Sequence, residues 1–219
     1  MLRWGRVSAV AGLMGAAALA LSASDRRAVA ADHLDPPTRT DPAFDTTADR
    51  AADIADVYVW HTAENLVIAL TFAGPAPPGE AAVYDRDVLY TINISNRGAP
   101  TDPEVQIRFR FGQDAAGASG VEITGLPDGG PPLVGPVETT LSRNGILARA
   151  GLYDDPFFFD LQGFRETGAT GTLSFVSSRN FFAASNDTAL VVQIPRSQIE
   201  TGEELNIWAT AARIGGQLQ

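Results

Sequence analysis

Two neighbouring stretches near the middle of the chain alternate apolar and polar residues at every second position. The apolar positions are Val88, Tyr90, Ile92 and Ile94 in the first stretch, and Val105, Ile107, Phe109 and Phe111 in the second. This period of two is typical of a strand with one buried face. The segment between them, residues 96–103, contains glycine, proline and aspartate, which favour a turn. We therefore predict an antiparallel pair whose apolar sides share a core, with Arg108 and Arg110 facing solvent.

Similar short apolar or alternating runs follow one another along the rest of the chain. They predict strands at residues 57–61, 66–72, 121–124, 137–141, 146–149, 172–177, 189–194 and 205–211. The 21 glycines and 14 prolines favour many short elements joined by turns. Beyond residue 30 no long stretch has a helical period, and only one helical turn is expected, at residues 196–199. The prediction is an all-β fold, an antiparallel β-sandwich of about nine to eleven strands with long loops and little helix.

The beginning of the chain has the features of a secretory signal peptide. Two arginines precede a small and apolar run over residues 7–21, and Ala28-Val29-Ala30 fits the small-x-small cleavage pattern. The run is shorter than the roughly 20 residues that span a bilayer, although an uncleaved anchor is the alternative. We predict a signal peptide over residues 1–30, an extended acidic lead-in over 31–52 and a sandwich domain over 53–219. The mature protein is then secreted or periplasmic, without a transmembrane segment.

The mature part of the chain is strongly acidic. Residues 32–219 carry 12 arginines and no lysine against 25 acidic residues, a net charge of −13. Such a surface repels phosphate backbones, so we expect no nucleic-acid partner, while divalent cations or basic partners are favoured. Cysteine is missing from the sequence, which excludes disulfides, thiolate metal sites and a cysteine nucleophile. The alanine-rich, lysine-free composition indicates a bacterial genome rich in G and C.

Acidic residues stand at the ends of several predicted strands. The candidate metal ligands are His33, Asp35, Asp53, Asp56, Asp85, Asp87, Asp154 and Asp155. If the strands that follow Asp56 and Asp87 lie side by side, their carboxylates converge and must spread into solvent, take up protons or bind a cation. Oxygen ligands alone favour Ca²⁺, whereas His33 among carboxylates suits Zn, Mn or Fe. Solvated turn formers are the alternative for all of these aspartates.

Motifs of known enzyme classes are missing from the sequence. There is no GxSxG elbow, HExxH pair, Walker loop or GxGxxG, and only two histidines are present. Asp154 and Asp155 resemble a glycosidase carboxylate pair, but adjacent residues of a strand point to opposite faces. We expect Asp155 to cap the turn at Pro156, and Phe157 and Phe159 to anchor the core. No catalytic residue is therefore assigned.

Several pieces of the sequence resemble one bacterial family, the domain of unknown function 4331. In chain order they are DHLDPP, DIADVYVW, YDRDVLYTINISNRG, VQIRFRFG, GLYDDPFFFDL, ALVVQIP and LNIWATAAR, and they span nearly all of residues 32–213. The resemblance implies a secreted or cell-surface β-rich protein without an established activity. The loop after Ile94 reads SNRGAPTD, where the family has a denser acidic run. Because the family pattern continues beyond WATAAR, the resemblance also implies a short member or a piece of a longer protein.

These observations favour a secreted, non-catalytic β-sandwich with a binding or structural role, stabilised by a divalent cation. The alternative is a metal-dependent hydrolase that uses His33 and nearby aspartates. The ligand class stays open between a small molecule, a glycan and a protein. Tyr58, Trp60, Tyr84 and Trp208 are candidates for a sugar-stacking surface, although aromatic residues at such spacings more commonly lie in a core.

Overall fold

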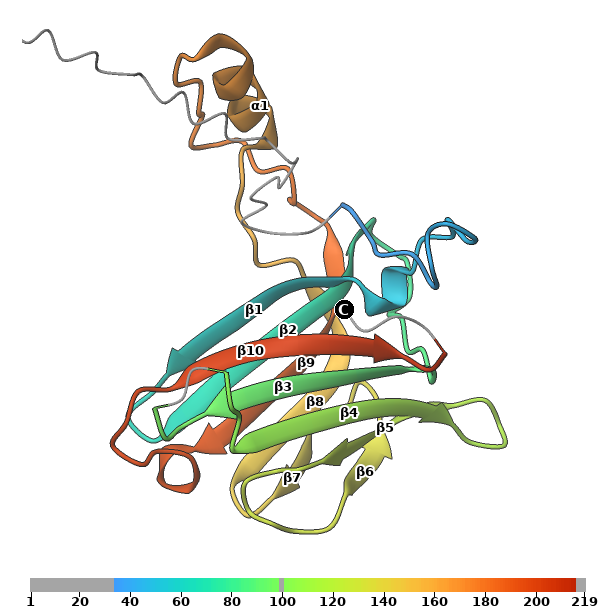
Figure 1. The fold of residues 1–219 in the computed structure, drawn as a ribbon, viewed down its shortest axis with the longest axis vertical. Coiled ribbons are helices and arrows are strands. Elements are labelled where there is room, and N and C mark those ends of the chain that lie inside the picture. The colour runs from blue at the N-terminus through green and yellow to red at the C-terminus, as the bar shows by residue number, and fades with distance from the viewer. Residues whose placement is uncertain (1–33, 99–100, 216–219) are drawn as a thin grey trace, which may run out of the picture. The chain divides into compact units, whose positions relative to one another are not determined.

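A computed structural model describes residues 34–98 and 101–215 (Figure 1). In these residues ten strands form two antiparallel sheets of five strands each, which confirms the predicted all-β class and strand number. The first sheet has the order β1-β2-β9-β8-β7, and the second has the order β10-β3-β4-β5-β6. No helix in the described part of the chain is long and apolar enough to cross a membrane.

The strands are short and are joined mostly by turns. Their bounds are β1 Ile54–His61, β2 Asn65–Ala76, β3 Val88–Ser95, β4 Val105–Gln113, β5 Ser119–Thr124, β6 Leu133–Pro136, β7 Leu141–Arg143, β8 Ile146–Asp154, β9 Asn186–Pro195 and β10 Asn206–Arg213. The helical elements are η1 Arg50–Ala52, α1 Leu161–Thr170 and η2 Arg196–Gln198. The helical turn expected after Pro195 is therefore present as η2.

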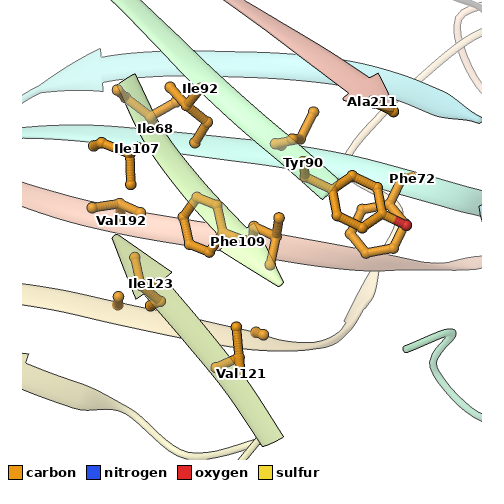
Figure 2. Close-up of a cluster of buried hydrophobic side chains, with 14 of the residues drawn as sticks. Ile68, Phe72, Tyr90, Ile92, Ile107, Phe109, Val121, Ile123, Val192 and Ala211 are labelled. Carbon is orange, nitrogen blue, oxygen red and sulfur yellow. The ribbon is translucent and has the colours of Figure 1, made fainter. Parts of the chain in front are cut away.

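The core lies between the apolar sides of the two sheets, as Figure 2 shows. In the second sheet Tyr90 pairs with Phe109 and Ile92 with Ile107, and all four side chains are fully buried. The ring of Phe72, from β2 of the first sheet, lies 4.1 Å from that of Tyr90 between centroids. The predicted register of β3 and β4 is confirmed, because Phe109 points inward while Arg108 and Arg110 are exposed.

The lead-in is more structured than an extended segment. Thr38 and Ala48 form an isolated antiparallel bridge, and η1 places Ala51 in the core. The hydroxyl of Tyr90 donates a hydrogen bond to the carbonyl of Ala51, which ties the lead-in to the centre of the second sheet. The lead-in therefore belongs to the packing of the sandwich.

Three predictions about individual elements are wrong. The expected strand at residues 137–141 is a turn between β6 and β7, in which Glu138 has a φ of 59°. The expected strand at residues 172–177 is irregular, and α1 precedes it where no helix of ten residues was predicted. Asp160 caps α1 by accepting a hydrogen bond from the amide of Gly163 at 2.9 Å, and Gly171 ends the helix in the left-handed conformation.

Residues 155–185, here called the aromatic arm, connect β8 to β9 and leave the sandwich beyond the end of β8 (Figure 1). Phe157 and Phe159 were expected in the sandwich core but are half-buried within this arm. Their rings lie 5.6 Å apart, and the arm adds Phe164 at 5.5 Å from Phe159 and Phe182 at 5.2 Å from Phe157. The arm is thus a small aromatic cluster of its own. The predicted cap at Pro156 is confirmed, because the carboxylate of Asp155 accepts a hydrogen bond from the Phe157 amide at 2.8 Å.

Candidate functional site

The structure divides the predicted metal ligands between the two sheets. Asp56 belongs to β1 of the first sheet, whereas Asp85 and Asp87 precede β3 of the second. Asp85 lies instead beside Asp49 of the lead-in, and Arg213 joins them, donating from Nη2 to Asp49 Oδ1 at 2.6 Å and to Asp85 Oδ2 at 2.7 Å. The strands β1 and β3 are therefore not neighbours in one sheet, which was the condition for the predicted convergence of Asp56 and Asp87.

Arg213 holds Asp85 in its ionised form. Burial disfavours the charged Asp85 carboxyl, but hydrogen bonds from Arg213 and from the Asp87 amide outweigh it, so the pKa of Asp85 lies below its usual value. Asp49 is buried, with a side chain that is 2% exposed, and Arg213 is 11% exposed. Asp49 and Arg213 were missed by the sequence analysis, and together with Asp85 they form a structural ion-pair network.

The remaining predicted ligands have varied surroundings. Asp35, Asp87 and Asp154 are exposed, and Asp87 lies 3.7 Å from Arg86. Asp53 is buried at the start of β1, where its carbonyl accepts a hydrogen bond from the Ala73 amide at 2.9 Å. His33 lies outside the described residues. The other histidine, His61, is exposed at the end of β1.

The negative charges of three aspartates act on Tyr58, and we call this set the Tyr58 acidic group: Tyr58, Asp56, Asp155 and Asp187. The Tyr58 hydroxyl donates to Asp56 Oδ2 at 2.9 Å. Burial, that hydrogen bond and the charges of Asp56, Asp155 and Asp187 raise the pKa of Tyr58 well above its usual value. Asp187 is 1% exposed on β9, and Gly74 of β2 lies so close that an added Cβ would come within 1.5 Å of Asp187 Oδ1.

The Tyr58 acidic group unites two predicted ligands with one that the sequence analysis missed. Asp56 and Asp155 were both candidates, whereas Asp187, two residues before the strand predicted at 189–194, was overlooked. Within residues 34–98 and 101–215, no group of three or more histidine, cysteine, aspartate or glutamate side chains is arranged to hold a metal ion. The group therefore supplies negative charge and oxygen atoms rather than a complete coordination sphere.

Other carboxylates form ion pairs with arginine that no sequence motif predicts. Arg143 donates to both oxygens of Asp128, at 2.6 and 2.7 Å, and these bonds lower the pKa of Asp128 to about 2. Asp160 of the aromatic arm accepts from the Val176 amide at 2.7 Å and from Arg179 at 2.9 Å. These pairs fix loops to one another, which is a structural role.

The outer side of the second sheet carries a connected row of polar side chains beside a tryptophan. Trp208 of β10 pairs with Asn93 of β3, which pairs with Gln106 of β4. In this row Gln106 Nε2 donates to Asn93 Oδ1 at 2.9 Å, and the guanidinium of Arg108 donates to Gln106 Oε1. Neighbouring β10 residues Ile207 and Ala209 pack toward the core, which places Trp208 on the opposite side. We call this surface, made of Trp208, Thr210, Asn93, Gln106 and Arg108, the Trp208 face.

A shallow pocket continues the Trp208 face beyond β4. It is lined by Glu104, Gln106 and Arg108 together with the turn at residues 125–129. Gly125 allows that turn to cross β4 closely, because its φ is +73° and an added Cβ would come within 2.0 Å of the Gln106 carbonyl. A bulkier residue would push the turn away, so Gly125 shapes the pocket wall.

The four aromatic residues considered for sugar stacking do not share one surface. Tyr58 and Trp60 belong to β1 of the first sheet, and Tyr84 packs against the core with its ring 5.0 Å from that of Phe111. Only Trp208 among these four lies beside the polar row of the second sheet. Comparisons of the chain with protein-family models, with curated proteins and with solved structures found no match.

Proposed function

We propose that this chain is a secreted, non-catalytic β-sandwich that binds its ligand through the Trp208 face. The observation that carries the proposal is the hydrogen-bonded row of Asn93, Gln106 and Arg108 beside Trp208. Polar side chains held in place next to an aromatic ring supply specificity and contact area without a large ordering cost. The rigid sheet beneath them is the kind of scaffold that keeps such a surface in one shape.

The charge state of the described carboxyl groups supports a non-catalytic role. Five of them have a pKa below the ordinary value: Asp45, Asp85, Asp128, Glu138 and Asp160. In Asp85, Glu138 and Asp160 burial opposes the charged form, and hydrogen bonds from arginine, tyrosine or backbone amides outweigh it. A general acid at neutral pH needs the opposite shift. These groups are suited to hold the fold together.

Metal analysis and turnover assays separate this proposal from a hydrolase that uses His33 and nearby aspartates. We expect the mature protein, beginning after Ala30, to contain no stoichiometric Zn or Mn by plasma mass spectrometry. We also expect no turnover of nitrophenyl esters, phosphates or glycosides when either metal is added. One bound Zn or Mn per chain, with turnover that His33→Ala abolishes, would overturn the non-catalytic proposal. Asp114→Ala is the matched control, because Asp114 is an exposed residue of the turn between β4 and β5.

A stabilising calcium ion is a second element of the proposal, supported by the Tyr58 acidic group. The charges of Asp56, Asp155 and Asp187 all act on the partly buried Tyr58, and a cation held by Asp56 through oxygen ligands and water would lower the negative charge around this ring. Binding at a hundredfold excess over the dissociation constant adds about 2.7 kcal/mol. For a domain of roughly 150–250 residues this corresponds to a rise of about 5–10 °C in the unfolding midpoint.

The measurement is a thermal melt of the mature protein in chelator and in millimolar Ca²⁺. We expect the higher midpoint in Ca²⁺, and a much smaller response in Asp187→Asn, which removes one of the three charges. The response to Ca²⁺ is compared within each variant, because the substitution also changes the starting stability. Asp87→Asn is the control, since Asp87 is exposed and precedes a strand of the other sheet. Equal midpoints of the unmodified protein in the two solutions would remove calcium from the proposal.

A further inference from the structure

The Trp208 face runs across three adjacent strands, as the strand register shows. Trp208, Asn93 and Gln106 lie opposite one another on three adjacent strands, β10, β3 and β4, which Figure 1 shows side by side. Strands are spaced about 4.8 Å apart, so the row from Trp208 to Gln106 spans about 10 Å. The pocket lined by Glu104, Gln106 and Arg108 extends it further. A ligand that contacts the whole row is therefore an extended one.

The chemistry of the row combines an apolar ring with groups that both donate and accept hydrogen bonds. Trp208 is half-buried and lies on the same side of the sheet as the row. Each amide has two N–H donors and two lone pairs, and Thr210 adds a hydroxyl that donates and accepts. A sugar ring presents the complementary pattern, with an apolar C–H face and a rim of hydroxyl groups.

The polar groups of the row are oriented before any ligand arrives. Asn93 is 4% exposed, and its Oδ1 holds the Nε2 of Gln106 at 2.9 Å. Arg108 holds the Oε1 of Gln106 from the other side. Fixing Gln106 in the unbound protein removes part of the side-chain entropy that binding would otherwise cost. Asn93 thus acts as a positioning residue, and Gln106 is the contact residue.

The local charge of this surface differs from that of the whole chain. Arg108 and Arg110 point outward from β4, Glu122 pairs directly with Arg110, and Glu104 lines the adjoining pocket. Arg108 of the Trp208 face is balanced by Glu104 of the pocket, and Arg110 beside the face is balanced by Glu122, although the chain carries −10 overall. A charged polymer therefore gains no net electrostatic attraction at this surface. An uncharged polymer rich in hydroxyl groups can bind without burying a charge that has no partner.

We propose, resting on the binding role assigned above, that the Trp208 face binds a neutral polysaccharide strand laid across β10, β3 and β4. One sugar ring stacks on Trp208, and Gln106 and Arg108 hydrogen-bond hydroxyl groups further along the strand. The ligand class is fixed by the aromatic platform, the fixed amides and the neutral local charge.

Affinity gel electrophoresis of the mature protein tests the proposal. The probes are hydroxyethyl cellulose, xylan, mannan and soluble β-1,3-glucan as neutral polymers, with polygalacturonate as the anionic one. We expect at least one neutral polymer to retard the protein, and Trp208→Ala and Gln106→Ala to weaken that retardation at least tenfold. Trp60→Ala is the matched control, because Trp60 is 49% exposed on the other sheet, and its retardation should equal that of the unmodified protein.

The outcomes distinguish this inference from the broader binding role. Retardation by polygalacturonate alone that requires Trp208 would overturn the neutral ligand and leave the Trp208 face as a binding surface. Retardation by no polymer, or retardation unchanged by Trp208→Ala, would overturn the polysaccharide assignment. The non-catalytic role is tested separately, by the metal analysis and the turnover assays. Circular dichroism of each variant shows that a loss of retardation is not a loss of fold.

Discussion

Replacing Phe109 by alanine is expected to lower the free energy of unfolding by about 3–5 kcal/mol. The Phe109 side chain is fully buried between Tyr90 on β3 and Ile123 on β5, its partners in the register of the second sheet. Its removal leaves a cavity where the two sheets meet, and the rigid strands around it collapse only in part. Urea unfolding followed by circular dichroism measures the loss.

The matched control for this prediction is the neighbouring residue on the opposite face. Arg108→Ala should cost well under about 1 kcal/mol, because Arg108 is exposed and most surface substitutions have small effects. Comparable losses from the two variants would contradict the register, since a shift of one residue exchanges the two faces of a strand. Arg108→Ala is also expected to weaken ligand binding, so stability and binding report on different faces of β4.

The register of β3 and β4 could be predicted because it depends on local pattern. One face of this sheet is buried against the other, so the apolar residues must recur at every second position. The same alternation placed Asn93 and Gln106 on the polar side, although their adjacency needed the pairing of the two strands. Trp208 joins them only through the pairing of β10 with β3, which no local signal specifies.

The helix α1 could not be predicted in this way because its own sequence favours helix weakly. Its ten residues, LQGFRETGAT, include two glycines and two threonines, which have low helix propensity. The helix depends on Asp160, which caps its first turn and also binds Val176 and Arg179 after the helix has ended. This support comes from contacts within the aromatic arm rather than from the periodicity of the segment.

The grouping of the acidic residues was the least predictable part of the candidate site. Spacing along the chain suggested that Asp56 and Asp87 converge, but β1 and β3 belong to different sheets. Arg213 lies 164 positions from Asp49 and 128 from Asp85, so neither partner could be inferred from a motif. Charge pairing across such separations is decided by the strand order, which is a property of the whole fold.

Loss of the Arg213 side chain is expected to destabilise the protein by about 3 kcal/mol at pH 7. The guanidinium forms a two-pronged pair with Asp49 and a further bond to Asp85, and all three side chains are at least partly buried. Removing one partner of a buried pair leaves uncompensated charge and typically costs about 3–5 kcal/mol. The lower end applies because Asp85 is 21% exposed and can recruit water.

Two further variants test the geometry of this network. Arg213→Lys keeps the charge but not the planar fork, so an intermediate loss of about 1–2 kcal/mol is expected. Arg149→Ala is the matched control, because Arg149 and its partner Glu138 are 40% and 43% exposed, and exposed pairs contribute about 0–1 kcal/mol. A loss in Arg149→Ala equal to that in Arg213→Ala would show that burial does not decide the effect.

The pH dependence of the unfolding free energy tests whether lost charge pairing causes the destabilisation of Arg213→Ala. In the unmodified protein the pKa of Asp85 lies below its ordinary value of 3.8, so its contribution is present above that pH and is lost as the pH falls through the folded-state pKa. In Arg213→Ala the guanidinium between Asp85 and Asp49 is lost, which raises the pKa of Asp85, and protonation of Asp85 in mild acid relieves the repulsion. The difference in unfolding free energy between the two proteins should therefore be smaller at pH 4 than at pH 7. An equal difference at both values would assign the loss to side-chain packing instead of charge.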